Sequence, residues 1–158
     1  MEDKIINSVV HICKIEELSV TERKLVSKAI EATNRSYAKY SRFNVGAALL
    51  LENGAEIIGC NQENAAFSVT ICAERTALFS AGAQYPGQPV TMLAIAARNE
   101  KGLLPAPVTP CGSCRQAMVE HEQRSGKPMR ILLYGTECIY IIDGIRNLMP
   151  LSFDENQL

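Results

Sequence analysis

The chain has 158 residues, which is enough for one well-buried domain and too few for two of ordinary size. Apolar residues make up 47% and charged residues 21%, and 16 basic residues nearly balance 17 acidic ones. This balance argues against a nucleic-acid-binding surface, and no apolar run approaches the roughly 20 residues that cross a membrane. Because no basic and apolar leader opens the chain, we expect a soluble cytoplasmic protein.

A long amphipathic helix is expected over residues 17–37. Apolar residues recur there at helical spacing, and Ser19 or Thr21 together with Glu22 forms a helix start signal. Residues 1–16 form an extension of unknown role in front of a single domain that otherwise includes the whole chain. The apolar stretch within this extension fits either an additional strand or a helical arm.

The rest of the chain alternates between strand and helix patterns. Glu52-Asn53-Gly54 is a turn signal that joins the first two strands into a hairpin. Helices interleaved with strands imply a sheet that is covered on both faces. The predicted fold class is therefore α/β, a three-layer α/β/α sandwich around a mixed sheet of about five strands. We expect strands over residues 45–51, 56–60, 91–97, 130–134 and 139–142, and helices over 70–83 and 111–122.

Three of the six cysteines stand at predicted helix starts, which indicates metal binding. Cys72 opens one helix, and Cys111 and Cys114 open another. The free N–H groups and the positive dipole end of a helix N-terminus favour thiolates. We therefore predict that the three sulfurs converge on one Zn²⁺ per chain. Three protein ligands with one open position are typical of catalytic zinc, whereas structural zinc takes four.

Two charged residues follow Cys72 closely enough to act at the same site. Glu74 is expected beside the open coordination position, as a carrier of protons and not as a ligand. Arg75, three positions after Cys72, reaches the same face of its helix. We hypothesise that its guanidinium hydrogen-bonds the thiolates and withdraws part of their negative charge. A zinc-activated water beside a carboxylate is hydrolytic machinery.

Other interpretations of the cysteines remain open from the residues alone. The three thiols are alternatively unrelated and buried, or Cys60 or Cys138 completes a structural four-cysteine site. Outside such a site, Cys13, Cys60 and Cys138 are expected to be small core side chains. The competing functional classes are a zinc-stabilised binding module and a thiol–disulfide oxidoreductase.

Several segments resemble the small homotetrameric zinc-dependent cytidine deaminases in their three-cysteine form. The resemblance covers about residues 20–153 and implies hydrolysis of cytidine or 2′-deoxycytidine to the uridine nucleoside and ammonia, in pyrimidine salvage. It also implies that Glu74 shuttles the proton, as in zinc deaminases generally, and that a homotetramer shares its active sites between subunits. The motifs are Cys72-Ala73-Glu74, Pro110-Cys111-Gly112-Ser113-Cys114, Phe43-Asn44-Val45-Gly46-Ala47-Ala48 and Asn61-Gln62-Glu63-Asn64-Ala65.

The resemblance assigns further residues to the nucleoside. Phe43 would stack against the pyrimidine, and Asn61 and Glu63 would hydrogen-bond the ribose hydroxyls. The remaining contacts would come from the backbone of Ala73, from Ala65 of a neighbouring subunit, and from Phe153, an aromatic that closes an adjoining pocket.

Two positions depart from the family pattern, and two groups of relatives fit less well. Phe67 stands where many relatives carry Tyr, and Leu151 stands where Gly is common. Relatives that act on antibiotic cytosine nucleosides lack the Asn-x-Glu-Asn segment found here at residues 61–64. Polynucleotide-editing relatives usually carry His at the position of Cys72 and need a basic groove.

Overall fold

All strands of the protein belong to one mixed sheet in the computed structural model, which describes residues 1–158. The order is β1-β7-β6-β4-β2-β3, and β5 pairs with β4. Neighbours run antiparallel except for β4 and β6, which are parallel. The strands are β1 (His11–Cys13), β2 (Asn44–Leu51), β3 (Glu56–Cys60), β4 (Val90–Asn99), β5 (Gly102–Leu103), β6 (Arg130–Tyr134) and β7 (Ile139–Asp143).

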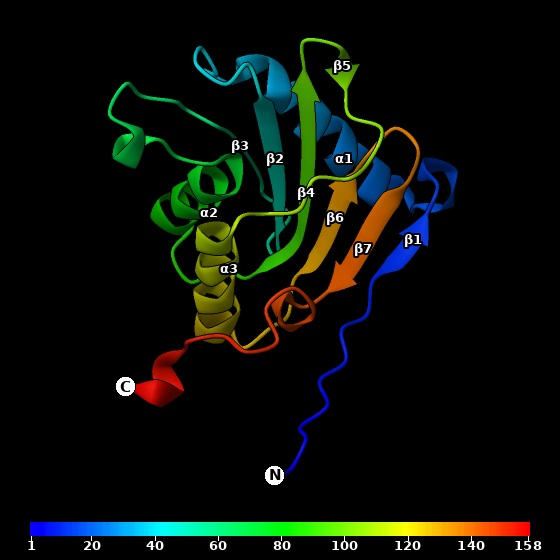
Figure 1. The fold of residues 1–158 in the computed structure, drawn as a ribbon. Helices are drawn as coiled ribbons and strands as arrows, with labels where there is room; N and C mark the ends of the chain where they lie inside the picture. Colours follow the sequence, from blue (N-terminus) through cyan, green and yellow to red (C-terminus); the bar gives the residue numbers. More distant parts are fainter.

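Three helices cover the two faces of this sheet. Helix α1 (Val20–Ala32) lies behind the sheet in Figure 1, and α2 (Ala73–Gln84) and α3 (Gly112–Ser125) lie side by side in front of it. Each face has its own apolar core, because alternate residues of a strand point to opposite faces. In β6, for example, Ile131 packs under α2 and α3 while Leu132 packs under α1. The predicted three-layer sandwich is confirmed.

The sheet has seven strands, compared with the expected number of about five. The two additional strands, β1 and β5, are only three and two residues long, too short for a periodic pattern. Of the extension, only His11–Cys13 is a strand; residues 1–10 have no regular structure and are exposed. Val9 is nevertheless fixed, since its N–H donates to Oδ1 of Asn147 at 2.8 Å.

Helix α1 is shorter than expected, because single 3₁₀ turns flank it at Ile15–Glu17 and Thr33–Arg35. Its start follows the predicted signal: Ser19 is the N-cap, and Ser19 and Glu22 form a reciprocal capping box. Helix α2 starts at Ala73, later than expected, because Ile71 forms a β-bridge with Gln62 and Cys72 has extended backbone as the N-cap. A 3₁₀ turn, Phe67–Val69, precedes this segment. No helix is both long and apolar enough to cross a membrane.

The connections bring two helix N-termini together. Helix α3 is part of the crossover between the parallel strands β4 and β6, and the loop 104–110 leads into its first turn from β5, which pairs with the end of β4. Helix α2 follows β3 and packs beside α3 on the same face of the sheet (Figure 1). Ligand sites of open α/β sheets form beyond the carboxyl ends of parallel strands, which is where Cys111 is delivered.

Gly59 in β3 allows α2 to lie close to the sheet. A Cβ at this position would stand 2.5 Å from the Ala73 carbonyl oxygen and 2.6 Å from the Ala77 nitrogen. Both atoms are backbone, so the clash would be relieved only by moving the helix that begins directly after Cys72.

Replacing Gly59 by Ala is therefore expected to destabilise the fold by about 1–3 kcal/mol, the usual cost of overpacking. Urea unfolding followed by circular dichroism measures the change. The matched control is Gly82→Ala, where no atom lies within 4 Å of the added methyl group. This helical position should gain about 0.5–1 kcal/mol from the better helix former. An unchanged unfolding midpoint for Gly59→Ala would contradict the close approach.

Candidate metal centre and active site

The thiols of Cys72, Cys111 and Cys114 converge between α2 and α3. Their sulfur atoms all lie within 4.8 Å of one another, with 3.8 Å from Cys72 to Cys111 and 3.5 Å from Cys111 to Cys114. Cys72 and Cys111 are the N-cap residues of their helices, and Cys114 is buried in the first turn of α3. Both helix N-termini therefore direct their free N–H groups and positive dipole ends toward one cluster of sulfur.

The cluster fits a tetrahedral zinc ion. Zn–S bonds of about 2.3 Å place two sulfurs of a tetrahedron about 3.8 Å apart, close to both measured separations. All six cysteines are free thiols, so no disulfide competes for these sulfurs. Cys60 and Cys138 are not part of the cluster, and the Cys60 thiol donates instead to the Arg35 carbonyl at 3.2 Å. The cluster thus offers three protein ligands, as predicted, and leaves one position of the tetrahedron to another ligand.

The pKa of the Cys72 thiol lies far below its usual value. A hydrogen bond from Cys114, together with those from Arg75 and Cys111, lowers the pKa of Cys72 to about 5. Cys114 shows the opposite direction: its pKa is raised by its bond to Cys72 and by burial. A thiolate is already favoured before all three sulfurs are engaged, which suits a cation site.

Glu74 is buried next to the thiols of Cys72 and Cys114. It is the second residue of α2 and is only 5% exposed. Burial raises the pKa of its carboxyl group, and the negative charge of Cys72 raises it further. A carboxyl group with this tendency to hold a proton, placed beside the thiols of Cys72 and Cys114, has the chemistry of a general acid and base.

Arg75 contacts the sulfur of Cys72. Its Nη2 lies 3.7 Å from the Cys72 Sγ, and this contact raises the pKa of the guanidinium. The Nε atom of Arg75 is buried without a hydrogen-bond partner. Arg75 also lines a groove of about 710 Å³ between α2 and α3, on the side that carries Phe79 and Tyr85.

Two loops meet at one edge of the site. Asn61 fixes the entry to β2: its Oδ1 accepts from the Val45 N–H at 2.7 Å, and its Nδ2 donates to the Phe43 carbonyl at 2.9 Å. Glu63 accepts from the Tyr40 N–H at 2.7 Å and from the Ser41 hydroxyl. The bond from Ser41 lowers the pKa of Glu63, so this carboxylate is an acceptor.

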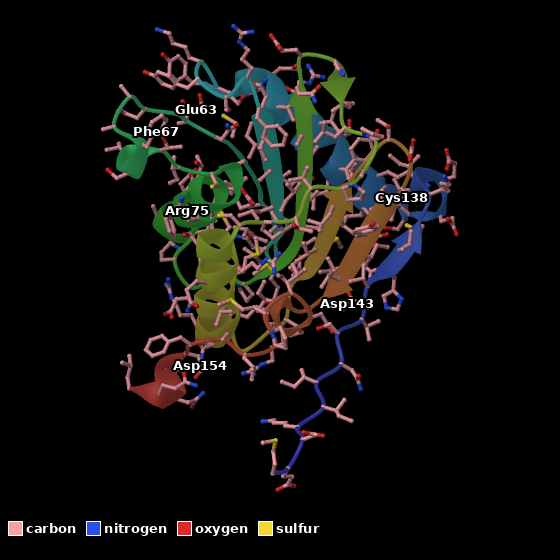
Figure 2. All side chains as sticks on the ribbon, in the orientation of Figure 1. Glu63, Phe67, Arg75, Cys138, Asp143 and Asp154 are labelled. Atoms are coloured by element: carbon pink, nitrogen blue, oxygen red, sulfur yellow. The ribbon has the colours of Figure 1, made fainter.

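The other predicted substrate residues are spread over the molecule. Ala73 is fully buried at the start of α2, and Phe43 is half-buried before β2. Ala65 lies in the exposed loop that continues to Phe67, whose ring is 76% exposed and packs edge-on against Tyr40. Phe153 is not brought to this loop: Figure 2 shows the neighbouring Asp154 at the opposite end of the α2–α3 face from Glu63 and Phe67.

An α/β sandwich that gathers three thiols and a buried carboxyl group at two helix N-termini defines a zinc enzyme of hydrolytic type. Comparison with known proteins makes this class more specific. The model of the cytidine and deoxycytidylate deaminase zinc-binding region matches residues 19–125. The chain belongs to this family, and the cysteine cluster is its site for one Zn²⁺.

The similar proteins include cytidine deaminases from other organisms and solved structures. A cytidine deaminase of Halalkalibacterium halodurans is 47% identical over 96 residues, which is 61% of this chain and 68% of that protein. One of Sporosarcina psychrophila is 45% identical over 97 residues, 61% of this chain and 67% of that protein. The crystal structure of a cytidine deaminase from Burkholderia pseudomallei matches with a TM-score of 0.73 and 35% identity, covering 85% of this chain and all of that one.

Two side chains that bind the end of the chain from the helix of Cys111 and Cys114 were missed by the sequence interpretation. Arg115 and Gln116 follow Cys114 on α3 and bind the backbone carbonyls of Leu148 and Phe153, the two ends of the C-terminal segment, residues 148–153. Their partners are main-chain atoms far along the chain, so no spacing in the sequence could indicate them. The only signal was the position of both residues immediately after a metal ligand.

Proposed function

We propose that the protein hydrolyses cytidine and 2′-deoxycytidine to the corresponding uridine nucleosides and ammonia. The observation that carries this proposal is the buried carboxyl group of Glu74 beside three zinc-binding thiols, in a chain 47% identical over 96 residues to a cytidine deaminase. Free nucleosides of this kind arise from nucleic-acid turnover, so the reaction belongs to pyrimidine salvage. The six free thiols support a reducing compartment, the cytoplasm.

Glu74 moves the protons of this reaction. Bound zinc supplies a Lewis acid that makes water a nucleophile near neutral pH. The Glu74 carboxylate accepts a proton from that water and delivers it to N3 of the cytosine ring, which makes C4 electrophilic. The oxygen of that water forms a new bond to C4. Glu74 then takes the second proton of this oxygen and gives it to the amino nitrogen, so the C4–N bond breaks, ammonia leaves, and C4 keeps the oxygen as the carbonyl of the uridine ring. The raised pKa of the buried carboxyl group supports both deliveries.

The nucleoside contacts are assigned to the two loops at the edge of the site. Phe43 stacks on the pyrimidine, and Asn61 and Glu63 bind the ribose hydroxyls. These assignments are supported by the hydrogen bonds that join the two loops. One of them runs from the Glu63 N–H to the Tyr37 carbonyl at 2.8 Å. The Asn61 amide keeps one lone pair and one N–H free for a hydroxyl group. Ala73 contributes its backbone, and Ala65 and Phe153 contribute to the pocket of an adjoining subunit.

A homotetramer with shared active sites completes the proposal. Large apolar side chains are exposed on both sides of the α2–α3 face, where a second copy would cover them. They lie on the 61–72 loop, on α2 and in the C-terminal segment, away from the opposite layer formed by α1 (Figures 1 and 2). Among them are Phe67, Val69, Phe79, Leu151 and Phe153.

The test is an ultraviolet assay of cytidine and deoxycytidine turnover by the purified protein, with ammonia and zinc measured in the same sample. We expect stoichiometric ammonia and uridine from a protein that holds one zinc ion per chain. Zinc-loaded protein that releases no ammonia from either nucleoside would refute deamination and favour a zinc-stabilised binding module.

Replacing Arg75 by Gln is expected to lower the turnover number by about 10–100-fold while zinc remains bound, the usual effect of a partner behind a metal ligand. Three thiolates give a zinc site a net negative charge, and the guanidinium contact with Cys72 offsets part of it. Zinc content and cytidine turnover are measured together. The control is Arg35→Gln, because the Arg35 side chain is exposed and forms an ion pair with Glu31 on the surface. Unchanged turnover in Arg75→Gln would show that Arg75 does not offset the charge of the thiolates in a way that matters for catalysis.

A further inference from the structure

Arg115 connects the turn that carries Cys111 to the C-terminal segment, residues 148–153. It is half-buried on α3, immediately after Cys114. Its Nε donates to the Pro110 carbonyl at 2.9 Å, and its Nη1 donates to the Leu148 carbonyl at 2.8 Å. One planar guanidinium therefore binds the residue directly before Cys111 and a residue near the end of the chain.

Cys111 is the sulfur of the cluster that most needs this support. Cys114 is fully buried within α3, and Cys72 receives the contact from Arg75. Cys111 is exposed, and its thiol has no hydrogen-bond partner other than the two neighbouring sulfurs. The position of its sulfur thus depends on the backbone turn at Pro110, which is buried and which Arg115 holds by its carbonyl.

The same helix makes two further contacts to the end of the chain, one to the C-terminal segment and one to the residues just before it. Gln116 donates from Nε2 to the Phe153 carbonyl at 2.8 Å. Glu122 accepts through Oε1 from the Ile145 N–H at 2.9 Å, seven residues along the helix from Arg115 and so on the same face. Of these three side chains, only Arg115 also contacts the turn before a metal ligand, which makes it the link between the two regions.

We propose that Arg115 is a positioning residue that holds the Cys111 turn and the C-terminal segment in one arrangement, so that zinc retention depends on it. The proposal rests on the zinc site and not on the identity of the substrate. Cys111, as the least restrained ligand, is the sulfur that detaches first when a chelator competes for the metal. Loss of the Arg115 bonds frees its turn and accelerates that step.

The experiment follows zinc release from the full-length zinc-loaded protein into an excess of a colorimetric chelator. Arg115→Met is expected to release zinc about 10–100-fold faster than the unmodified protein, as for other groups that orient metal ligands. Arg115→Lys keeps the charge but lacks the planar fork that reaches both carbonyls, so its rate should be intermediate. The matched control, Gln116→Leu, removes only the bond to Phe153 and should release zinc at the original rate.

A second readout tests the link to the C-terminal segment. In zinc-loaded Arg115→Met, hydrogen–deuterium exchange over residues 148–153 should be faster than in the unmodified protein. A folded Arg115→Met variant that releases zinc at the original rate, or unaltered exchange over this segment, would overturn the proposal. Release from Gln116→Leu as fast as from Arg115→Met would overturn it too. If Arg115→Met does not fold, the zinc-release rate of Arg115→Lys tests the proposal instead, and a rate equal to that of the unmodified protein would overturn it. Neither readout needs a substrate, so a failure of the deaminase proposal would be seen separately.

Discussion

Replacing Glu74 by Gln is expected to reduce cytidine turnover by about 10²–10⁴-fold while one zinc ion stays bound. The amide has nearly the same volume as the carboxyl group, so the buried position beside the thiols remains filled. It cannot accept and return a proton, and both deliveries to the substrate are lost. The thiols of Cys72, Cys111 and Cys114 are untouched by this change. Turnover by ultraviolet absorbance and zinc by atomic absorption give the two quantities.

The control for this substitution is Glu16→Gln, the same chemical change at an exposed residue in front of α1. It should leave both turnover and zinc content as they are. A Glu74→Gln protein with turnover within about tenfold of the unmodified enzyme would show that another group carries the proton. Loss of zinc from Glu74→Gln would instead assign this residue to the metal.

The central layers of the fold could be predicted because their residues repeat a simple pattern. Strands β2, β4 and β6 are apolar on both faces, as a sheet between two helix layers requires. Ser19 and Glu22 marked the start of α1 through a capping box. The short strands β1 and β5 could not be predicted, since two or three residues show no period. Their pairing with β7 and β4 depends on contacts between distant parts of the chain.

The features of the site likewise fall into those that a local sequence signal predicts and those that depend on contacts between distant parts of the chain. The three thiols were predictable because each sits at a helix start, and a helix start is a local feature of the sequence. The close approach of α2 at Gly59 was not, because it depends on which helix crosses β3. The Asn61 amide shows most clearly which contacts the sequence could not predict. Its side chain was assigned to the ribose, and the structure shows that it also bridges the backbone of Phe43 and Val45.

Metal affinity and stability are linked at this site, because Cys72 and Cys111 are also the N-cap residues of two core helices. Neither receives the side-chain hydrogen bond that a Ser or Asp cap would accept. A cation held by these thiolates joins α2 to α3 at their N-termini. Anything that binds the folded state alone stabilises it by mass action, so zinc should raise the melting temperature.

Replacing Cys72 by Ala is therefore expected to abolish zinc binding and activity and to remove the zinc-dependent part of the thermal stability. Only two of three thiols remain, and the one whose pKa is lowered to about 5 is gone. Zinc content should fall from one per chain to below about 0.1, and added zinc should no longer raise the melting temperature. Scanning calorimetry with and without zinc, together with metal analysis, measures both effects.

The matched control is Cys138→Ala, which removes a half-buried thiol outside the cluster and should keep one zinc per chain. Cys111→Ser serves where Cys72→Ala does not fold, because Cys111 is exposed and its replacement costs little packing. Zinc retained at one per chain in either Cys72→Ala or Cys111→Ser would mean that the ion is held elsewhere. Loss of zinc in Cys138→Ala would point the same way. Zinc lost only from the cluster variants would tie metal, stability and turnover to the same three sulfurs.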